Sequence, residues 1–199
     1  MPDNPDSTSV AYRFELPDGT SYSFTVSVGA RPLERTVSDP PEWAKLDVHK
    51  CPHCPLDATE SPWCPAALSI SDAVKTLGDL WSHQRVALTV TTPERSFVFD
   101  DVQLQDALRS LMGLVLATSG CPHTAFFRPM ARFHTSMSSV EETVYRATSM
   151  YLLGQWVRRS EGGDTDFSQL LPMAVEESLA PLRPMFEAYV RPPGSPGAG

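Results

Sequence analysis

Two stretches of alternating apolar and polar residues predict two β-hairpins in the first half of the chain. Residues 10–28 alternate on both sides of the sequence Pro-Asp-Gly-Thr at 17–20, which is a strong hairpin turn signal. Residues 85–92 and 95–100 alternate in the same way around a short Pro-Glu turn. The alternating apolar residues of the first hairpin are Tyr12, Phe14, Leu16, Tyr22, Phe24 and Val26.

Two further segments have the spacing of apolar residues that is typical of helices. Residues 64–81 have Pro65 where a first helical residue is expected. Residues 101–118 are apolar all round in their second half, which predicts a buried central helix that ends at Gly120. The predicted apolar stripe of the first of these helices is Ala67, Ile70, Val74, Leu77 and Trp81.

Residues 138–159 form the clearest predicted helix. Ser138 or Ser139 can cap its start, with a glutamate three positions later at 141 or 142, as in a capping box. Residues 164–190 suggest further short helices, interrupted by prolines. These prolines are Pro172, Pro181 and Pro184.

The order of these elements predicts an α+β fold. Two β-hairpins form a small antiparallel sheet, packed against about four helices that cover one face. We expect a single domain over 11–190, between disordered tails at 1–10 and 191–199. Residues 30–64 carry many prolines and little periodicity, and so long a stretch without regular structure usually has a function or an ordering ligand.

The net charge and the hydropathy of the chain bear on which kinds of partner it can bind and where it is located. The net charge of −8 argues against nucleic acid, because phosphate binding needs a basic face. It also argues against anionic membrane surfaces. The N-terminus lacks the basic and apolar regions of a signal peptide, and no apolar run approaches the length of a membrane span. We therefore expect a cytoplasmic protein, in which thiols stay reduced.

The four cysteines carry the strongest chemical signal. Their spacing is Cys51-x2-Cys54-x9-Cys64-x56-Cys121, and a proline follows each one. A C-x2-C pair lets one turn of backbone present two thiolates to a metal, and four thiolates complete a structural zinc site. The same four thiolates would also match a [4Fe–4S] cluster. The sequence therefore predicts a cysteine-rich metal loop that binds Zn²⁺, with the cluster as the alternative.

Local electrostatics and the prolines bear on this prediction. Cys64 lies at a predicted helix N-terminus, which favours thiolate, whereas Cys121 follows a helix C-terminus, where a bound cation is favoured over a bare thiolate. Pro55 occupies a position that is usually flexible in zinc knuckles, and Cys-Pro steps are common in iron–sulfur loops. Other readings remain open: buried unreactive thiols, a thioredoxin-like redox pair, or a haem motif.

Histidines and arginines near the cysteines are secondary candidates. His123 is two residues from Cys121 and can complete or support a metal site. His134 follows an aromatic, arginine-rich loop and can act as an acid, a base or a ligand for substrate, although such a histidine more often caps a helix or packs in the core. Arg128 and Arg132 can form an anion site there, or ordinary salt bridges. His49 and His53 fit exposed loop positions.

Several familiar enzyme motifs are missing. The sequence contains no phosphate-binding loop, no dinucleotide fingerprint, no nucleophile elbow and no HExxH zinc motif. Whether the protein is an enzyme is therefore left undecided by the sequence.

The motifs together resemble one known family. CPHCPL at 51–56, SGCP at 119–122, FFRPMARFHTS at 126–136 and SMYLLGQW at 149–156 are similar to an uncharacterised family of small bacterial proteins with Cys-Pro motifs, known only as a domain of unknown function. The resemblance implies a bacterial cytoplasmic protein with a cysteine-based site, and it implies no activity.

From these observations we expect a cytoplasmic, metal-binding accessory or regulatory protein that acts through a protein partner. Its structural zinc would be held by Cys51, Cys54, Cys64 and Cys121. The alternatives are an iron–sulfur redox or sensor protein, and a metal- or cysteine-dependent enzyme with a site at 121–134.

Overall fold

A computed structural model describes residues 7–29, 37 and 39–166 of the chain. It comprises two compact units, one that ends at Met137 and one that begins at Ser138. The tail predicted at 191–199 and most of the short helices predicted over 164–190 lie outside the described residues.

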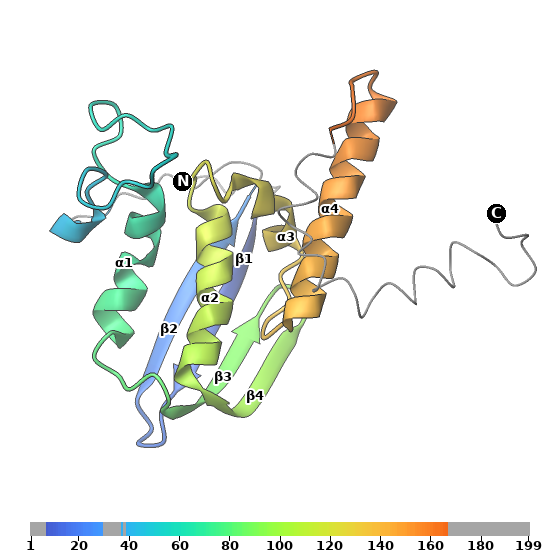
Figure 1. Cartoon of the computed structure of the whole chain (residues 1–199). Helices are drawn as coiled ribbons and strands as arrows, with labels where there is room; N and C mark the ends of the chain where they lie inside the picture. The colour runs from blue at the N-terminus through green and yellow to red at the C-terminus, as the bar shows by residue number, and fades with distance from the viewer. Residues whose placement is uncertain (1–6, 30–36, 38, 167–199) are drawn as a thin grey trace, which may run out of the picture. The chain divides into compact units, whose positions relative to one another are not determined.

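The first unit contains a four-stranded antiparallel sheet (Figure 1). Its strands are β1 (Thr8–Glu15), β2 (Ser21–Val28), β3 (Arg85–Thr91) and β4 (Ser96–Gln103), in the spatial order β2-β1-β3-β4. Both predicted hairpins are confirmed, and antiparallel pairing of β1 with β3 joins them into one sheet. β1 begins before the expected domain start at residue 11.

The first hairpin turns where the sequence predicts. Gly19 has a φ of +86°, which a glycine adopts without strain, and its N–H donates to the carbonyl of Leu16 at 2.9 Å. Asp18 accepts from the N–H of Thr20, so the turn is held by its own polar groups.

Four α-helices are present in the described ranges: α1 (Pro65–Leu77), α2 (Leu104–Thr118), α3 (Arg128–Arg132) and α4 (Val140–Ser160). Two 3₁₀ turns, η1 (Glu42–Ala44) and η2 (Ala125–Phe127), complete the regular structure there. Within the first unit, α1 and α2 cover one face of the sheet (Figure 1). The α+β class and the antiparallel sheet are thus confirmed.

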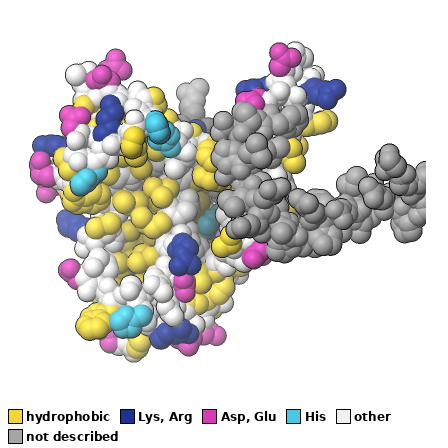
Figure 2. Space-filling model, viewed as in Figure 1, with side chains coloured by type: hydrophobic (Ala, Val, Ile, Leu, Met, Phe, Trp, Pro, Cys, Tyr) yellow, Lys and Arg dark blue, Asp and Glu magenta, His cyan; other side chains and the backbone are white. Residues whose placement is uncertain are grey.

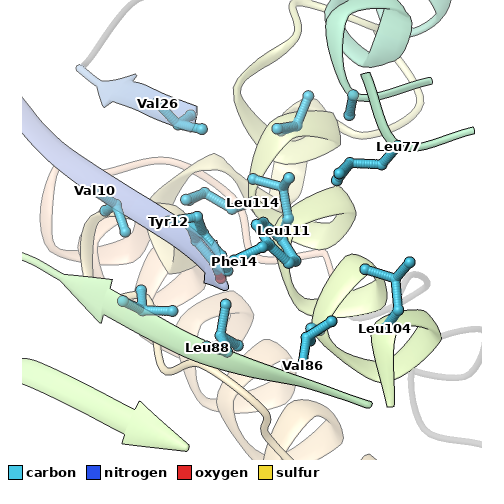
Figure 3. Close-up of a cluster of buried hydrophobic side chains, with 14 of the residues drawn as sticks. Val10, Tyr12, Phe14, Val26, Leu77, Val86, Leu88, Leu104, Leu111 and Leu114 are labelled. Atoms are coloured by element: carbon cyan, nitrogen blue, oxygen red, sulfur yellow. The ribbon is translucent and has the colours of Figure 1, made fainter. Parts of the chain in front are cut away.

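The core lies between that sheet face and α2 (Figure 3). Tyr12 and Phe14 of β1 are fully buried beside Leu111 and Leu114 of α2. Alternation in the strand and 3.6-residue spacing in the helix bring these side chains to one interface. Burial of each large apolar side chain contributes about 1.5–3 kcal/mol to folding.

The predicted apolar stripe of α1 is partly wrong. Leu77 is buried, but Val74 is 44% exposed and Trp81 is 71% exposed. The buried side of α1 instead includes the small residues Ser69 and Ala73. The helix ends at Leu77, and turns closed by backbone hydrogen bonds then take Trp81 off the helix.

Two other boundaries differ from the sequence prediction. Residues 101–103, expected in the central helix, belong to β4. The segment expected to be a loop after Cys121 contains η2 and α3. Pro129 stands in the first turn of α3, where proline favours helix initiation because the N–H it lacks would have no helical partner.

Candidate functional site

Two of the predicted metal ligands, Cys51 and Cys54, lie in residues 45–63, which we call the cysteine loop. Its base is closed by backbone contacts: Lys45 pairs with Trp63 in an isolated antiparallel bridge, and the N–H of Leu46 donates to the carbonyl of Pro62 at 2.9 Å. Leu46 is buried, which anchors this base. The loop therefore leaves and re-enters the fold at one place.

A tight turn lies in the outer part of the cysteine loop. The N–H of Cys54 donates to the carbonyl of Cys51 at 3.0 Å, so the C-x2-C pair occupies a single backbone turn. Cys51 is exposed, Cys54 is partly buried, and both thiols are free. Lys50 Nζ donates to the carbonyl of Leu56 at 2.6 Å across the same turn.

A second polar turn follows within the loop. The hydroxyl and the N–H of Thr59 both donate to the carboxylate of Asp57, at 2.6 and 2.8 Å. These hydrogen bonds hold the pKa of Asp57 below its usual value, because they stabilise the charged form. The outer part of the loop is thus shaped by its own polar groups, whereas its base is anchored by the buried Leu46.

The other two cysteines stand at helix ends, as predicted. Cys64 is the N-cap residue of α1, and its N–H donates to the carbonyl of Ala44 at 2.9 Å. Cys121 follows α2 after Gly120, whose φ of +83° ends the helix in the expected left-handed conformation. The N–H of Cys121 donates to Ser119 Oγ at 3.2 Å. Both thiols are partly buried and free.

The described residues do not present an assembled metal centre. Among them, no three or more His, Cys, Asp or Glu side chains are grouped so that they could hold a metal ion. The structure therefore shows the pair Cys51 and Cys54 on one turn, but not the predicted cysteine-rich metal loop as a formed site. His49, His53 and His123 are exposed.

A second group of polar side chains lies in the core of the first unit. The hydroxyl of Tyr12 on β1 is 2.9 Å from Ser110 Oγ on α2 and also hydrogen-bonds to His134 Nε2. Ser110 Oγ lies 3.2 Å from Ser136 Oγ. We call Tyr12, Ser110, His134 and Ser136 the hydroxyl cluster. It joins three parts of the chain that are far apart in sequence.

The backbone beside the hydroxyl cluster is also held in place. The N–H of Met137 donates to Ser110 Oγ at 3.1 Å, and Met137 has a φ of +56°, which is unusual for a residue with a side chain. Burial raises the pKa of Tyr12 to about 12, although hydrogen bonds from Ser110 and Ser136 oppose the shift. Tyr12 is therefore neutral at physiological pH and remains able to donate a proton in a hydrogen bond.

The two arginines near this region differ in their contacts. Arg132 forms an ion pair with Glu94 at 4.0 Å, and both side chains are about half exposed. Arg128 is partly buried, and its buried Nε makes no hydrogen bond within the part of the chain that the structure describes. The salt-bridge interpretation thus fits Arg132, whereas the buried Nε of Arg128 is a donor left for another group.

Of the hydroxyl cluster, sequence reasoning identified only His134 as a candidate. Tyr12 was expected as an apolar core residue, and Ser110 and Ser136 carried no signal. Tyr12 is 98 positions from Ser110 and 122 positions from His134. No spacing rule connects residues so far apart.

In class, the first unit is an α+β domain with helices on one face of an antiparallel sheet, bearing an outlying cysteine loop and a buried hydroxyl cluster. Residues 10–185 match the family model described as a domain of unknown function, DUF6901. The chain therefore belongs to this family. Comparison with the curated proteins and with solved structures produced no match. No helix in the described ranges is both long enough and apolar enough to cross a membrane.

Proposed function

We propose that this protein is a metal-binding accessory or regulatory protein of the cytoplasm, which acts through a protein partner. Its metal is Zn²⁺, and the ligands are the thiolates of Cys51, Cys54, Cys64 and Cys121. The observation that carries the proposal is the single turn that holds Cys51 and Cys54, closed by the 3.0 Å hydrogen bond between their backbones. This is the arrangement in which a C-x2-C pair supplies two thiolates to one zinc.

The positions of the remaining thiols support the same proposal. Cys64 follows directly after the closed base of the cysteine loop and caps α1, where the helix dipole favours its thiolate. Cys121 follows the C-terminus of α2, where a cation is favoured. Because the ligands are not grouped in the described residues, metal binding in this proposal is coupled to a rearrangement of the cysteine loop that brings the four thiolates together.

The test is metal content and affinity of protein purified without oxygen. We expect about one zinc per chain and a colourless solution, as a four-thiolate site predicts. Cys51→Ser removes one of the paired ligands and should lower zinc affinity at least about tenfold, measured by competition with a chromogenic chelator. His53→Gln, in the same turn but with no ligand role, is the matched control and should keep the affinity of the original chain.

The results separate the alternatives. Several irons per chain with a visible chromophore would replace zinc by an iron–sulfur cluster on the same cysteines. Protein that binds neither metal, or a Cys51→Ser variant with unchanged zinc affinity, would overturn the proposal. An unchanged Cys121→Ser variant would remove only that residue from the ligand set.

A second candidate function is an enzyme with its site at 121–134, supported by the position of His134, whose Nε2 is held by the hydroxyl of Tyr12. In this version three protein ligands and a water hold the metal near His134, instead of four thiolates. Cobalt-substituted protein distinguishes the two, since its visible spectrum reports the number of thiolate ligands. A cobalt spectrum typical of fewer than four thiolate ligands, which also changes in the His134→Gln variant, would support the enzyme. A spectrum typical of four thiolates, which stays the same in this variant, would contradict it.

A further inference from the structure

The second unit exposes a row of large apolar side chains on α4. Leu153 is 52% exposed and Trp156 is 65% exposed, although both belong to a regular helix. Residues three, four and seven apart on a helix are neighbours, so these side chains form one continuous surface. We define the apolar face of α4 as Tyr145, Leu152, Leu153, Trp156 and Val157. Contiguous apolar surface of this kind usually has an occupant.

The chain reverses direction directly after α4. Gly162 has a φ of +84°, and the N–H of Gly163 donates to the carbonyl of Arg158 at 2.9 Å, which ends the helix. At Asp166 the backbone is bound to side chains within α4: its N–H donates to Gln155 Oε1 at 2.8 Å, and its carbonyl accepts from the hydroxyl of Tyr151. The chain therefore leaves the described region beside the middle of α4, on the side of Tyr151 and Gln155, which is about 100° around the helix from Leu152 and Trp156.

The residues that follow have a composition that fits this surface. Residues 167–190 lie outside the described part of the structure, and their sequence is rich in large apolar residues. They include three glutamates and one arginine, whereas the last turn of α4 carries Arg158 and Arg159. α4 has 21 residues and is about 31 Å long at 1.5 Å per residue, so the 24 residues of 167–190 can span it. The large apolar residues are Phe167, Leu170, Leu171, Met173, Val175, Leu179, Leu182, Met185, Phe186, Tyr189 and Val190.

We propose that residues 167–190 of the same chain dock on the apolar face of α4. The hydrogen bonds to Asp166 fix the start of this segment against the helix, so its effective concentration at the face is high, on the order of millimolar for a short tether. No other chain can compete with it unless its own affinity is strong. The proposal concerns the second unit alone and is independent of the metal site.

Photocrosslinking in the full-length protein tests the proposal. p-Benzoylphenylalanine takes the place of Leu152, which belongs to the apolar face and is next to Tyr151. Irradiation should give crosslinks within one chain, and mass spectrometry should map most of them to 167–190. The matched control carries the same group in place of Thr143, which is exposed and lies nine positions earlier, on the opposite side of the helix at about 100° per residue. The variant with the photoreactive group at position 143 should not form crosslinks to 167–190.

A second variant tests whether apolar contact is the cause. Leu179→Asp places a charge in the segment and should reduce the yield of crosslinks from position 152 several-fold, while Ser178→Asp serves as the matched polar change. Crosslinks mainly between two chains would replace the proposed occupant by a second copy. Crosslinks mainly to residues 7–137, or equal yields from positions 152 and 143, would overturn the proposal.

Discussion

Tyr12 follows the alternation of apolar residues in β1, and its hydroxyl also forms hydrogen bonds that this alternation does not predict. Its place in the alternation of β1 predicts an apolar core side chain, and it is fully buried. Its hydroxyl then requires partners, because an unpaired buried hydroxyl costs about 1–3 kcal/mol. Ser110 and His134 supply them. The hydroxyl cluster is therefore the set of contacts that makes a tyrosine acceptable at the centre of this core.

The raised pKa of Tyr12 predicts a loss of stability in alkali. Its pKa is about 12 in the folded chain, against 10.0 for an ordinary tyrosine, so the folded state holds the phenolic proton more tightly. This contribution is complete below pH 10 and is lost as the pH rises from about 10 to 12. Two pKa units correspond to about 2–3 kcal/mol. Urea unfolding of the original chain at a series of pH values measures the loss.

Tyr12→Phe is the control for this titration. It removes the ionisable group and leaves Ser110 with one partner fewer, so the variant should be less stable by about 1–2 kcal/mol at pH 7. Its stability should fall less steeply above pH 10 than that of the original chain. Parallel curves for the two proteins above pH 10 would show that Tyr12 does not contribute to the alkaline transition.

At the scale of elements, the ends of helices and hairpins follow local chemistry. Ser139 caps α4, where its hydroxyl accepts from the N–H of Glu142 at 3.2 Å and the Glu142 carboxylate accepts from the N–H of Ser139 at 2.8 Å. Sequence alone left a choice between two serines and two glutamates, and the geometry selects one pair. α1 shows the limit of local reasoning: its start at Pro65 was predicted, but the side that is buried was not.

The capping box predicts a specific loss in α4. Ser139→Ala removes the side-chain acceptor for the first turn and should destabilise the helix by about 1 kcal/mol. Hydrogen exchange of the amides in the first turn of α4 measures the effect, and Glu142→Gln should retain most of the protection. Ser149→Ala, in the helix interior, is the matched control and should be neutral or slightly stabilising. Equal exchange in Ser139→Ala and the original chain would contradict the capping role.

At the scale of the whole molecule, stability of the first unit depends on one shared core. Pairing of β1 with β3 places Tyr12 beside Val90 and Phe14 beside Leu88, which brings both hairpins under α2. Polar and charged side chains remain on the surface together with several apolar ones (Figure 2). The apolar face of α4 belongs to the other unit.

Leu88 tests the shared core. It is fully buried on β3 between the elements of both hairpins, so Leu88→Ala should lower the free energy of unfolding by about 2–5 kcal/mol. Val98→Ala on β4 is the matched control, because Val98 is 64% exposed, and should cost less than about 1 kcal/mol. Thermal or urea unfolding followed by circular dichroism measures both. A small effect at Leu88 would mean that the hairpins do not share one cooperative core.

The sequence by itself determined the elements that depend on neighbouring residues. The hairpin turn at Gly19, the start of α1 at Pro65 and the end of α2 at Gly120 each follow from chemistry within a few positions. The same local chemistry limits the cap of α4 to two adjacent serines, of which the structure selects Ser139. The cysteine spacing likewise identified Cys51 and Cys54 as a candidate ligand pair, and the structure places both on one turn.

Only the tertiary structure decided which distant residues meet. It joined β1 to β3, buried Ser69 and Ala73 of α1 in place of Val74, and brought His134 to Tyr12 across 122 positions. It also left the four cysteines without a grouped metal centre in the described residues. The physical reason is that contacts between distant segments depend on how whole faces pack and which polar groups must be satisfied. Local periodicity contains no information about either.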